Sequence, residues 1–268
     1  MSIISKCQSD FVANKIITDN ILISFKTLHY MKSKHQGKTT HMAIKLDMSK
    51  AYDRVEWDYL KALMLKMGFH KKWVDLIMAG ISSVSYSVLV NGAPSGFIKP
   101  SRGIRQGNPL SPYLFLLCTE GFSALLRDAA HHGDLHGVSC SQNGPSITHL
   151  LFADESLLFC KASLSACHVI MEIIQANETA SGQKINSDKS SIFFSANTPL
   201  TLQEKIKCFF NADSNVPLEK YLGLPPVIGR GKKQAFNDVK SKIQNTLEGW
   251  KGKVLSQAGR EVLIKSVA

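Results

Sequence analysis

Ile147-Thr-His-Leu-Leu-Phe-Ala-Asp-Glu-Ser-Leu-Leu-Phe-Cys160 contains two apolar runs, residues 147–153 and 156–160, that are separated only by Asp154 and Glu155. Two such runs joined by two polar residues are typical of a β-hairpin with a tight turn. We therefore predict a hairpin with both carboxylates at its tip. An acidic residue in a turn is more often a plain turn residue than part of a site, so this pair needs a partner elsewhere in the chain.

A further acidic residue, Asp47, lies at the end of a strand predicted earlier in the chain. Apolar and other residues alternate from Met42 to Asp47, and this period of two predicts a strand that ends at Asp47. If the strand and the hairpin are neighbours in one sheet, Asp47, Asp154 and Glu155 form a cluster of carboxylates. Oxygen ligands suit Mg²⁺, and two such ions about 3.5–4 Å apart support phosphoryl transfer.

The rest of the chain interleaves helices with short strands. Amphipathic spacing predicts a helix capped by Thr18 with Ile21, Leu22, Phe25 and Leu28 inward, and others at 60–67, 73–81, 113–127 (capped by Ser111), 169–174 (ending near Gly182) and 236–250. A hairpin is predicted for 86–98 with Asn91-Gly92 as its turn, and a further strand for 191–195. This interleaving, with at least two tight hairpins, predicts an α+β fold.

Composition favours a polyanionic partner. The 268 residues carry 32 Lys and Arg against 21 Asp and Glu, a net charge of +11. Nine basic and three acidic residues lie in 229–268, so that segment holds +6 of the excess. Nucleic acid is the partner that such an excess favours first. The six cysteines form no C-x-x-C pair, which argues against zinc. The longest apolar run, residues 113–118, is too short for a membrane span, so we expect an intracellular protein.

Several segments, in the same order as in the family, resemble the motifs of reverse transcriptases from plant LINE-type non-LTR retrotransposons. They are Lys45-Leu-Asp-Met-Ser-Lys-Ala-Tyr-Asp53, Ser101-Arg-Gly-Ile-Arg-Gln-Gly-Asn-Pro-Leu-Ser-Pro112, Leu151-Phe-Ala-Asp-Glu155, Ser181-Gly-Gln-Lys-Ile-Asn-Ser-Asp-Lys-Ser190 and Tyr221-Leu-Gly-Leu-Pro225. Upstream, Gln8-Ser-Asp-Phe-Val12 and Ile17-Thr-Asp-Asn-Ile-Leu22 resemble a fingers segment, and Leu255-Ser-Gln-Ala-Gly-Arg-Glu261 resembles the region beyond the palm. The likeness covers almost the whole chain.

The resemblance implies a right-hand polymerase palm, which is an antiparallel sheet backed by helices. It implies partial fingers and palm in residues 1–228 and the start of a helical thumb or connection region in 229–268. It also implies that the chain begins after the first fingers segment and stops within the thumb, so we expect a truncated domain.

The resemblance also assigns catalytic roles. Asp47, Asp154 and Glu155 would hold two Mg²⁺ ions, with Mn²⁺ as an alternative, and the backbone carbonyl of Met48 would join them. Lys189 would lie near the leaving pyrophosphate as a general acid. An ordinary solvent-exposed lysine is the competing interpretation of Lys189.

Other residues would bind the substrates that the family uses. Tyr52 would be the steric gate that selects deoxynucleoside triphosphates, although a core aromatic residue is its competing interpretation. Arg105, Gln106, Gly107 and Lys15 would border the incoming nucleotide and the template. The primer grip would comprise Tyr221, Leu222, Gly223 and Leu224. The implied partners are an RNA template and a DNA primer, and a family member would work in the nucleus; the oligomeric state is not indicated.

Two departures from the family pattern bear on activity. Glu155 replaces the second aspartate of the hairpin motif, and Asn14-Lys15 stands where a Gly-Arg pair is common. With the expected truncation, they predict an impaired RNA-directed DNA polymerase. The alternative is a catalytically inactive remnant that at most binds nucleic acid. A third reading is a palm-like fold with cyclase or maturase chemistry, against which Tyr52 and the primer-grip segment argue.

Overall fold

The computed structural model describes residues 3–211, 221–222, 237–248 and 261. The chain forms two compact units, Met1–Pro226 and Val227–Ala268. In the second unit the structure describes Glu261 and helix α8 (Asn237–Glu248), which lies within the predicted helix. The basic residues Lys232 and Lys233, which we expected in the thumb, lie outside the described residues. No helix among the described residues is long and apolar enough to span a membrane.

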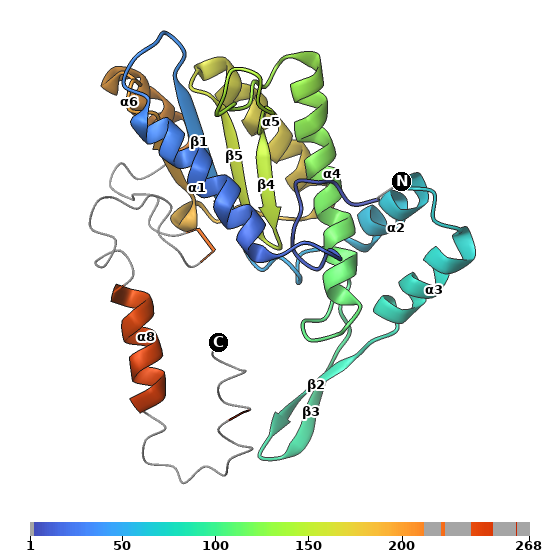
Figure 1. The fold of residues 1–268 in the computed structure, drawn as a ribbon. Helices are drawn as coiled ribbons and strands as arrows, with labels where there is room; N and C mark the ends of the chain where they lie inside the picture. The colour runs from blue at the N-terminus through green and yellow to red at the C-terminus, as the bar shows by residue number, and fades with distance from the viewer. Residues whose placement is uncertain (1–2, 212–220, 223–236, 249–260, 262–268) are drawn as a thin grey trace. The chain divides into compact units, whose positions relative to one another are not determined.

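The first unit is built on a four-stranded antiparallel sheet with the order β4-β5-β1-β6 (Figure 1). Its strands are β1 (His41–Asp47), β4 (His149–Phe152), β5 (Glu155–Lys161) and β6 (Ser191–Phe194). β1 lies between β5 and β6, and its register sets Asp47 opposite Glu155. The strand and the hairpin predicted from the two acidic segments are therefore neighbours.

Helices cover both faces of this sheet. In Figure 1, α1 (Ile17–Ser33) crosses in front of the sheet, whereas α5 (Leu164–Ser181) lies behind it. Because side chains alternate along β1, Met42, Ile44 and Leu46 enter the core while Lys45 and Asp47 face the other side. Each fully buried aliphatic side chain contributes about 1.5–3 kcal/mol, so this core holds β1 firmly.

Helices α2 (Trp57–Lys66), α3 (Lys71–Ser82) and α4 (Ser111–His132) lie where helices were predicted, with differences at their ends. The structure also describes helix α6 (Leu200–Phe209) and the 3₁₀ turn η1 (Ser187–Lys189), neither of which was predicted. The N-cap of α4 is Leu110, one residue before the predicted Ser111. Gly182 ends α5 with a φ of +74°, as predicted from its ability to adopt left-handed backbone.

The predicted inner face of α1 was partly wrong: Leu28 is buried, but Leu22 is exposed. The buried residues of the helix are Asn20, Ser24, Thr27, Leu28 and Met31, and Leu22 is 66% exposed. The N-cap is Ile16, so Thr18 lies inside the helix. The polar face is stable in the interior because its groups are hydrogen-bonded: the Asn20 amide donates to the Leu151 carbonyl at 2.8 Å.

The turn of the β4–β5 hairpin lies one residue earlier than predicted. Ala153 and Asp154 form it, and Glu155 is already the first residue of β5, paired with Phe152. Ala153 has a φ of +48°, a conformation that tight hairpin turns demand. Only Asp154 is therefore at the tip, and Glu155 belongs to the sheet.

A separate hairpin joins β2 (Tyr86–Val90) to β3 (Ala93–Ile98) through the predicted Asn91-Gly92 turn. Both turn residues have positive φ, 51° and 83°. Figure 1 shows this hairpin extending away from the four-stranded sheet. All its residues except Tyr86 are exposed, including Leu89 and Phe97 at 70% and 74%.

Candidate active site

The carboxylates of the two acidic segments meet at one end of the sheet. Asp47 ends β1 directly opposite Glu155, and residues directly opposite in a sheet share a face. The Met48 amide donates to the Asp154 carbonyl at 3.3 Å, which ties the residue after β1 to the hairpin turn. The structure thus brings together Asp47, Met48, Asp154 and Glu155.

Two lysines flank these carboxylates. Lys189 Nζ lies 3.8 Å from Asp47 Oδ1, and Lys45 Nζ lies 3.5 Å from Glu155 Oε1. Lys189 belongs to η1, and the Asn186 amide just before η1 donates to the Asp47 carbonyl at 2.8 Å. This backbone contact holds Lys189 beside Asp47.

The electrostatic setting of Asp47 favours a bound cation. Burial raises the pKa of Asp47; Lys189 lowers it, and the nearby charges of Asp154 and Glu155 raise it further. A carboxylate that is partly desolvated and close to like charges gains stability when a positive charge binds.

The donor set fits a hard divalent ion that substrate phosphates help to hold. Among the described residues, no three His, Cys, Asp or Glu side chains are grouped to hold a metal ion on their own. Asp47 and Asp154 are nevertheless close enough for Asp154 to raise the pKa of Asp47. Mg²⁺ commonly binds one or two carboxylates together with phosphates and water, so these two residues would hold it with the substrate.

Glu155 contacts the protein through both carboxylate oxygens. Oε1 faces Lys45, and Oε2 accepts a hydrogen bond from the Leu222 amide at 3.2 Å. The neighbouring Tyr221 is buried, with an exposure of 2%. Burial, and then the charge of Glu155, raises the pKa of the Tyr221 phenol. Tyr221 and Leu222 thus lie beside the carboxylates, whereas Gly223 and Leu224 lie outside the described residues.

Tyr52 lies next to the carboxylates and on the core. Its ring stacks on Phe115 with centroids 4.9 Å apart and planes at 16°. Burial, followed by the charges of Asp10 and Asp154, raises the pKa of the Tyr52 phenol. The ring therefore has a fixed orientation beside Asp154.

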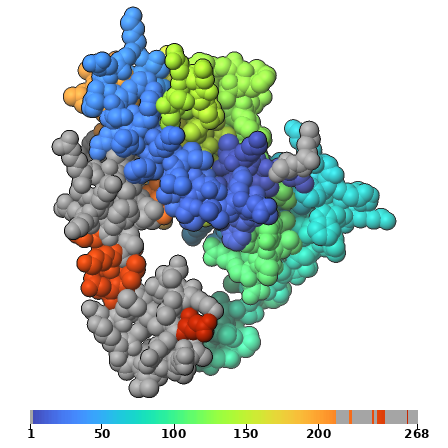
Figure 2. Space-filling model, viewed as in Figure 1, coloured from blue at the N-terminus to red at the C-terminus, as the bar shows by residue number. Residues whose placement is uncertain are grey.

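Asp10 is a site residue that the sequence interpretation missed. Gln8 forms a parallel bridge with Leu151 on β4, and this pairing brings the N-terminal segment to the hairpin. Burial raises the pKa of Asp10, the Phe11 amide lowers it, and Asp154 raises it. No local pattern in the sequence marks this pairing. In Figure 2 the N-terminal segment (dark blue) lies against α4 (green), where the Ser5 amide donates to Glu120 Oε1 at 2.8 Å.

The predicted nucleotide loop is docked onto the segment that contains Tyr52. The Ile104 amide donates to the Tyr52 carbonyl at 2.9 Å, and the Gly103 amide donates to the Val55 carbonyl at 2.8 Å. Gly103 has a φ of +88°, and an added Cβ would lie 2.8 Å from the Asp53 carbonyl oxygen. Glycine is therefore required there. Arg105, Gln106 and Gly107 are exposed beyond this anchor.

Lys15 does not join this group. Its ammonium contacts the backbone carbonyls of Ser5, Lys6 and Gln8 at 3.3, 2.8 and 2.5 Å. Burial lowers the pKa of Lys15. In this structure Lys15 stabilises the N-terminal segment that carries Asp10.

Comparison with known proteins gives a family and a fold. Residues 1–225 match the family model described as reverse transcriptase (RNA-dependent DNA polymerase). The 149 kDa protein of transposon TX1 from Xenopus laevis is 27% identical over 97% of this chain and 19% of its own length. The Pol polyprotein of retrotransposable element R2DM from Drosophila melanogaster is 28% identical over 74% of this chain and 19% of its own. A mitochondrial protein of Arabidopsis thaliana is 59% identical over 25% of this chain and 56% of its own length.

Solved telomerases share the fold. The Candida tropicalis enzyme truncated from its C-terminal domain aligns with a TM-score of 0.51 at 17% identity, over 71% of this chain and 36% of that chain. The Candida albicans enzyme, solved with a fragment of telomeric RNA, aligns with a TM-score of 0.51 at 13% identity, over 72% of this chain and 33% of that chain. These likenesses confirm the predicted α+β palm fold. The chain spans about a fifth of the length of the TX1 and R2DM proteins, and these relatives confirm the predicted resemblance to non-LTR retrotransposons. Because the family model matches residues 1–225, the chain belongs to the reverse transcriptase family.

Proposed function

We propose that this chain is the polymerase core of an RNA-directed DNA polymerase, which extends a DNA primer on an RNA template with deoxynucleoside triphosphates. The observation that carries the proposal is the cross-strand pairing of Asp47 with Glu155 beside Asp154. This pairing joins the two acidic segments of a chain in the reverse transcriptase family at one end of the palm sheet.

Asp47 and Asp154, with the backbone carbonyl of Met48, would hold two Mg²⁺ ions, or Mn²⁺ in their place. When bound, such ions activate the attacking oxygen and stabilise the leaving one. Lys189, whose ammonium is 3.8 Å from Asp47, would donate a proton to the leaving pyrophosphate. Its contact with Asp47 would orient the ammonium before the substrate binds.

Tyr52 would select the sugar. Its stacking on Phe115 holds the ring still, and a fixed ring beside Asp154 would occupy the space of a ribose 2′-hydroxyl. Gln106 and Gly107 would face the incoming nucleotide and the template, because the loop that bears them is hydrogen-bonded to the backbone of Tyr52. Arg105 would contact phosphates from the same loop.

Tyr221 and Leu222 would grip the primer, with Glu155 as a positioning residue. The Glu155 carboxylate holds the Leu222 amide at 3.2 Å and so joins the primer grip to β5. In this proposal Glu155 orients the primer end, and Asp47 and Asp154 provide the carboxylates for the metal ions.

The test is primer extension on a poly(rA)·oligo(dT) duplex with purified protein, first with Mg²⁺ and then with Mn²⁺. We expect extension by the parent chain and none by Asp154→Ala. Asp75→Ala, an exposed acidic residue on α3, is the matched control and should retain activity. Absence of extension by the parent with either ion would refute the polymerase function of this chain.

The alternative is a protein that binds nucleic acid without turnover. It is favoured by the engagement of both Glu155 oxygens with Lys45 and Leu222, which leaves Asp47 and Asp154 as the two predicted metal ligands with side-chain carboxylates. Under this alternative an RNA·DNA hybrid binds with an affinity that falls as salt rises, because a net charge of +11 attracts phosphates. The parent and Asp154→Ala would then bind equally, and neither would extend a primer.

A further inference from the structure

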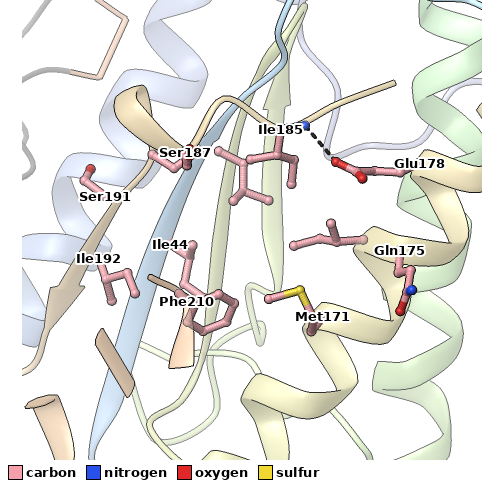
Figure 3. A pocket seen from close by; sticks show the side chains of 12 residues that line it. Ile44, Met171, Gln175, Glu178, Ile185, Ser187, Ser191, Ile192 and Phe210 are labelled. Atoms are coloured by element: carbon pink, nitrogen blue, oxygen red, sulfur yellow. Dashed lines mark hydrogen bonds between the residues drawn. The ribbon is translucent and has the colours of Figure 1, made fainter. Parts of the chain in front are cut away.

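A cavity of about 430 Å³ lies behind the sheet, on the face opposite Asp47 (Figure 3). Its apolar wall comes from Ile44 and Leu46 of β1, Ile192 of β6, and Met171 and Ile174 of α5. We infer that this cavity binds a small, uncharged and mostly apolar molecule, and that β1 and η1 transmit its binding to the Asp47–Lys189 pair. Nothing in the proposed polymerase reaction uses this cavity.

The size and lining of the cavity suit a compact ligand. Binding sites for small molecules commonly enclose about 300–1,000 Å³ and are lined by apolar side chains with a few polar groups. In Figure 3 the side chains of Ile44, Ile185 and Met171 surround one space from three elements of the chain. The ring of Phe210, the residue that follows α6, lines the same space.

The electrostatics of the lining select an uncharged ligand. Of the described residues that line the cavity, Glu178 alone is ionisable. Its carboxylate accepts a hydrogen bond from the Ile185 amide at 2.9 Å and pairs with Lys184 Nζ at 2.7 Å. The negative charge is therefore neutralised by the protein. Gln175 and Ser187 also line the cavity, and their side chains can form hydrogen bonds with a ligand that carries one polar group.

The wall of the cavity and the candidate active site share the strand β1. Side chains alternate along a strand, so Ile44 and Leu46 face the cavity while Lys45 and Asp47 face the other side. A ligand that presses on Leu46 also moves the backbone of Asp47. Leu46 of the cavity and Asp47 of the candidate active site are consecutive residues in the chain.

A second connection runs through the segment that precedes and forms η1. Ile185 and Ser187 line the cavity, and Lys189 of the same segment pairs with Asp47 at 3.8 Å. Ile185 forms an antiparallel bridge with Met48, the residue after Asp47. Displacement of Ile185 by a ligand therefore reaches both Met48 and Lys189.

Methionine methyl groups can report this binding directly. We would label the full chain with [methyl-¹³C]methionine and titrate it with N-phenyl-1-naphthylamine, an uncharged apolar probe with one N–H group. Met171 lines the cavity, whereas Met64 lines a separate apolar cavity of about 450 Å³ beside α3 and α4. Assignments come from Met171→Leu, Met64→Leu and Met48→Leu. The expected result is a saturable shift of the Met171 signal. A shift of the Met64 signal would report binding in the other cavity and would not change this expectation.

The transmission is tested by the Met48 signal in the same titration. Met48 does not line this cavity, so its methyl shift should follow the Met171 saturation curve only if the bridge to Ile185 moves. An unmoved Met171 signal at saturating probe overturns the binding site. A shifted Met171 with an unmoved Met48 overturns the transmission.

A matched pair of variants on α5 supplies the control. Met171→Trp fills the cavity and should lower the affinity for the probe by about tenfold or more. The Met48 signal measures the affinity in this variant. Glu172→Trp adds the same ring to the exposed side of the same helix and should leave probe affinity within about twofold. Equal affinity in both variants overturns the assignment of the site. These measurements do not require turnover, so they remain valid even if the proposed polymerase function fails. Only an effect of the probe on primer extension would rest on that function.

Discussion

Glu155 differs from the aspartate common in its motif by one methylene, and its contacts show what the added length does. An aspartate at this position would end about 1.5 Å closer to β5. The longer side chain reaches both Lys45 and the Leu222 amide. The residue thereby joins the palm sheet to the segment of Tyr221 and Leu222.

We predict that Glu155→Asp loses the contact with Leu222. Loss of a hydrogen bond to a partly buried carboxylate should lower the free energy of unfolding by about 1 kcal/mol, as measured by urea denaturation. Glu155→Gln is the control, because its amide oxygen still accepts from Leu222 while the ion pair with Lys45 is lost. An unchanged unfolding free energy in Glu155→Asp would contradict a positioning role.

Asp47 should oppose stability while serving function. Because burial raises its pKa in the folded state, its stabilising contribution is present at low pH and is lost as pH rises through the folded-state pKa. Asp47→Asn should therefore raise the free energy of unfolding at pH 7, by about 1 kcal/mol, and abolish primer extension. The gain should shrink toward pH 3, where the parent carboxyl is protonated.

Urea denaturation at both pH values measures this difference. Asp128→Asn, at an exposed position of α4, serves as the control and should show no comparable gain. A less stable Asp47→Asn variant at pH 7 would mean that the contact with Lys189 outweighs burial and like-charge repulsion.

Among the elements, α4 and α5 end in the same way but in different surroundings. Gly133 follows α4 with a φ of +82° and open space around it. Gly182 follows α5 with a φ of +74°, and an added Cβ would lie 2.4 Å from the Arg54 carbonyl oxygen. The end of α5 is thus packed against the segment that carries Tyr52.

This difference gives a matched pair of substitutions. Gly133→Ala should cost about 1 kcal/mol, the penalty for left-handed backbone alone. Gly182→Ala should cost about 3 kcal/mol or more, because the backbone of Arg54 must also move. Thermal or urea unfolding measures both. Similar costs in the two variants would show that the contact with Arg54 is easily relieved.

Most element types were predictable, although α6 was not predicted, and the faces and ends of the elements were less predictable. The period of two around Ile44 predicted β1 with its end at Asp47, and Asn91-Gly92 predicted the turn between β2 and β3. For α1, the apolar spacing predicted the burial of Leu28 correctly and that of Leu22 wrongly. Leu22 is exposed because Asn20 finds a specific hydrogen-bond acceptor on β4, which no local pattern reveals.

At the scale of the whole molecule, buried histidines couple folding to pH. His149 is fully buried, and its ring nitrogens contact Ser123 Oγ and Thr148 Oγ1, each at 2.9 Å. Burial, followed by the charge of Arg127, lowers the pKa of His149 to about 4. Burial, followed by the charge of Lys34, likewise lowers the pKa of His41 to about 4.

The free energy of unfolding should therefore fall as pH drops from about 6.5 toward 4. In this window the unfolded chain binds protons that the folded chain excludes, with a slope of about 1.4 kcal/mol per pH unit for each proton. Urea denaturation at several pH values measures the slope. His149→Gln should reduce this slope by up to the contribution of one proton, whereas His131→Gln, at an exposed position, should leave the slope unchanged. Equal slopes in all three proteins would contradict this.

The sequence by itself determined the family, the α+β class and the strands that carry the acidic residues, because these depend on local periodicity, turn chemistry and motifs in order. Tertiary structure alone decided which carboxylates meet and what each contacts. Asp47 lies opposite Glu155, Glu155 reaches Leu222, and Asp10 lies beside Asp154. These relations depend on strand register and on pairing between distant segments. They are set by packing of the whole core and leave no mark in any short stretch of residues.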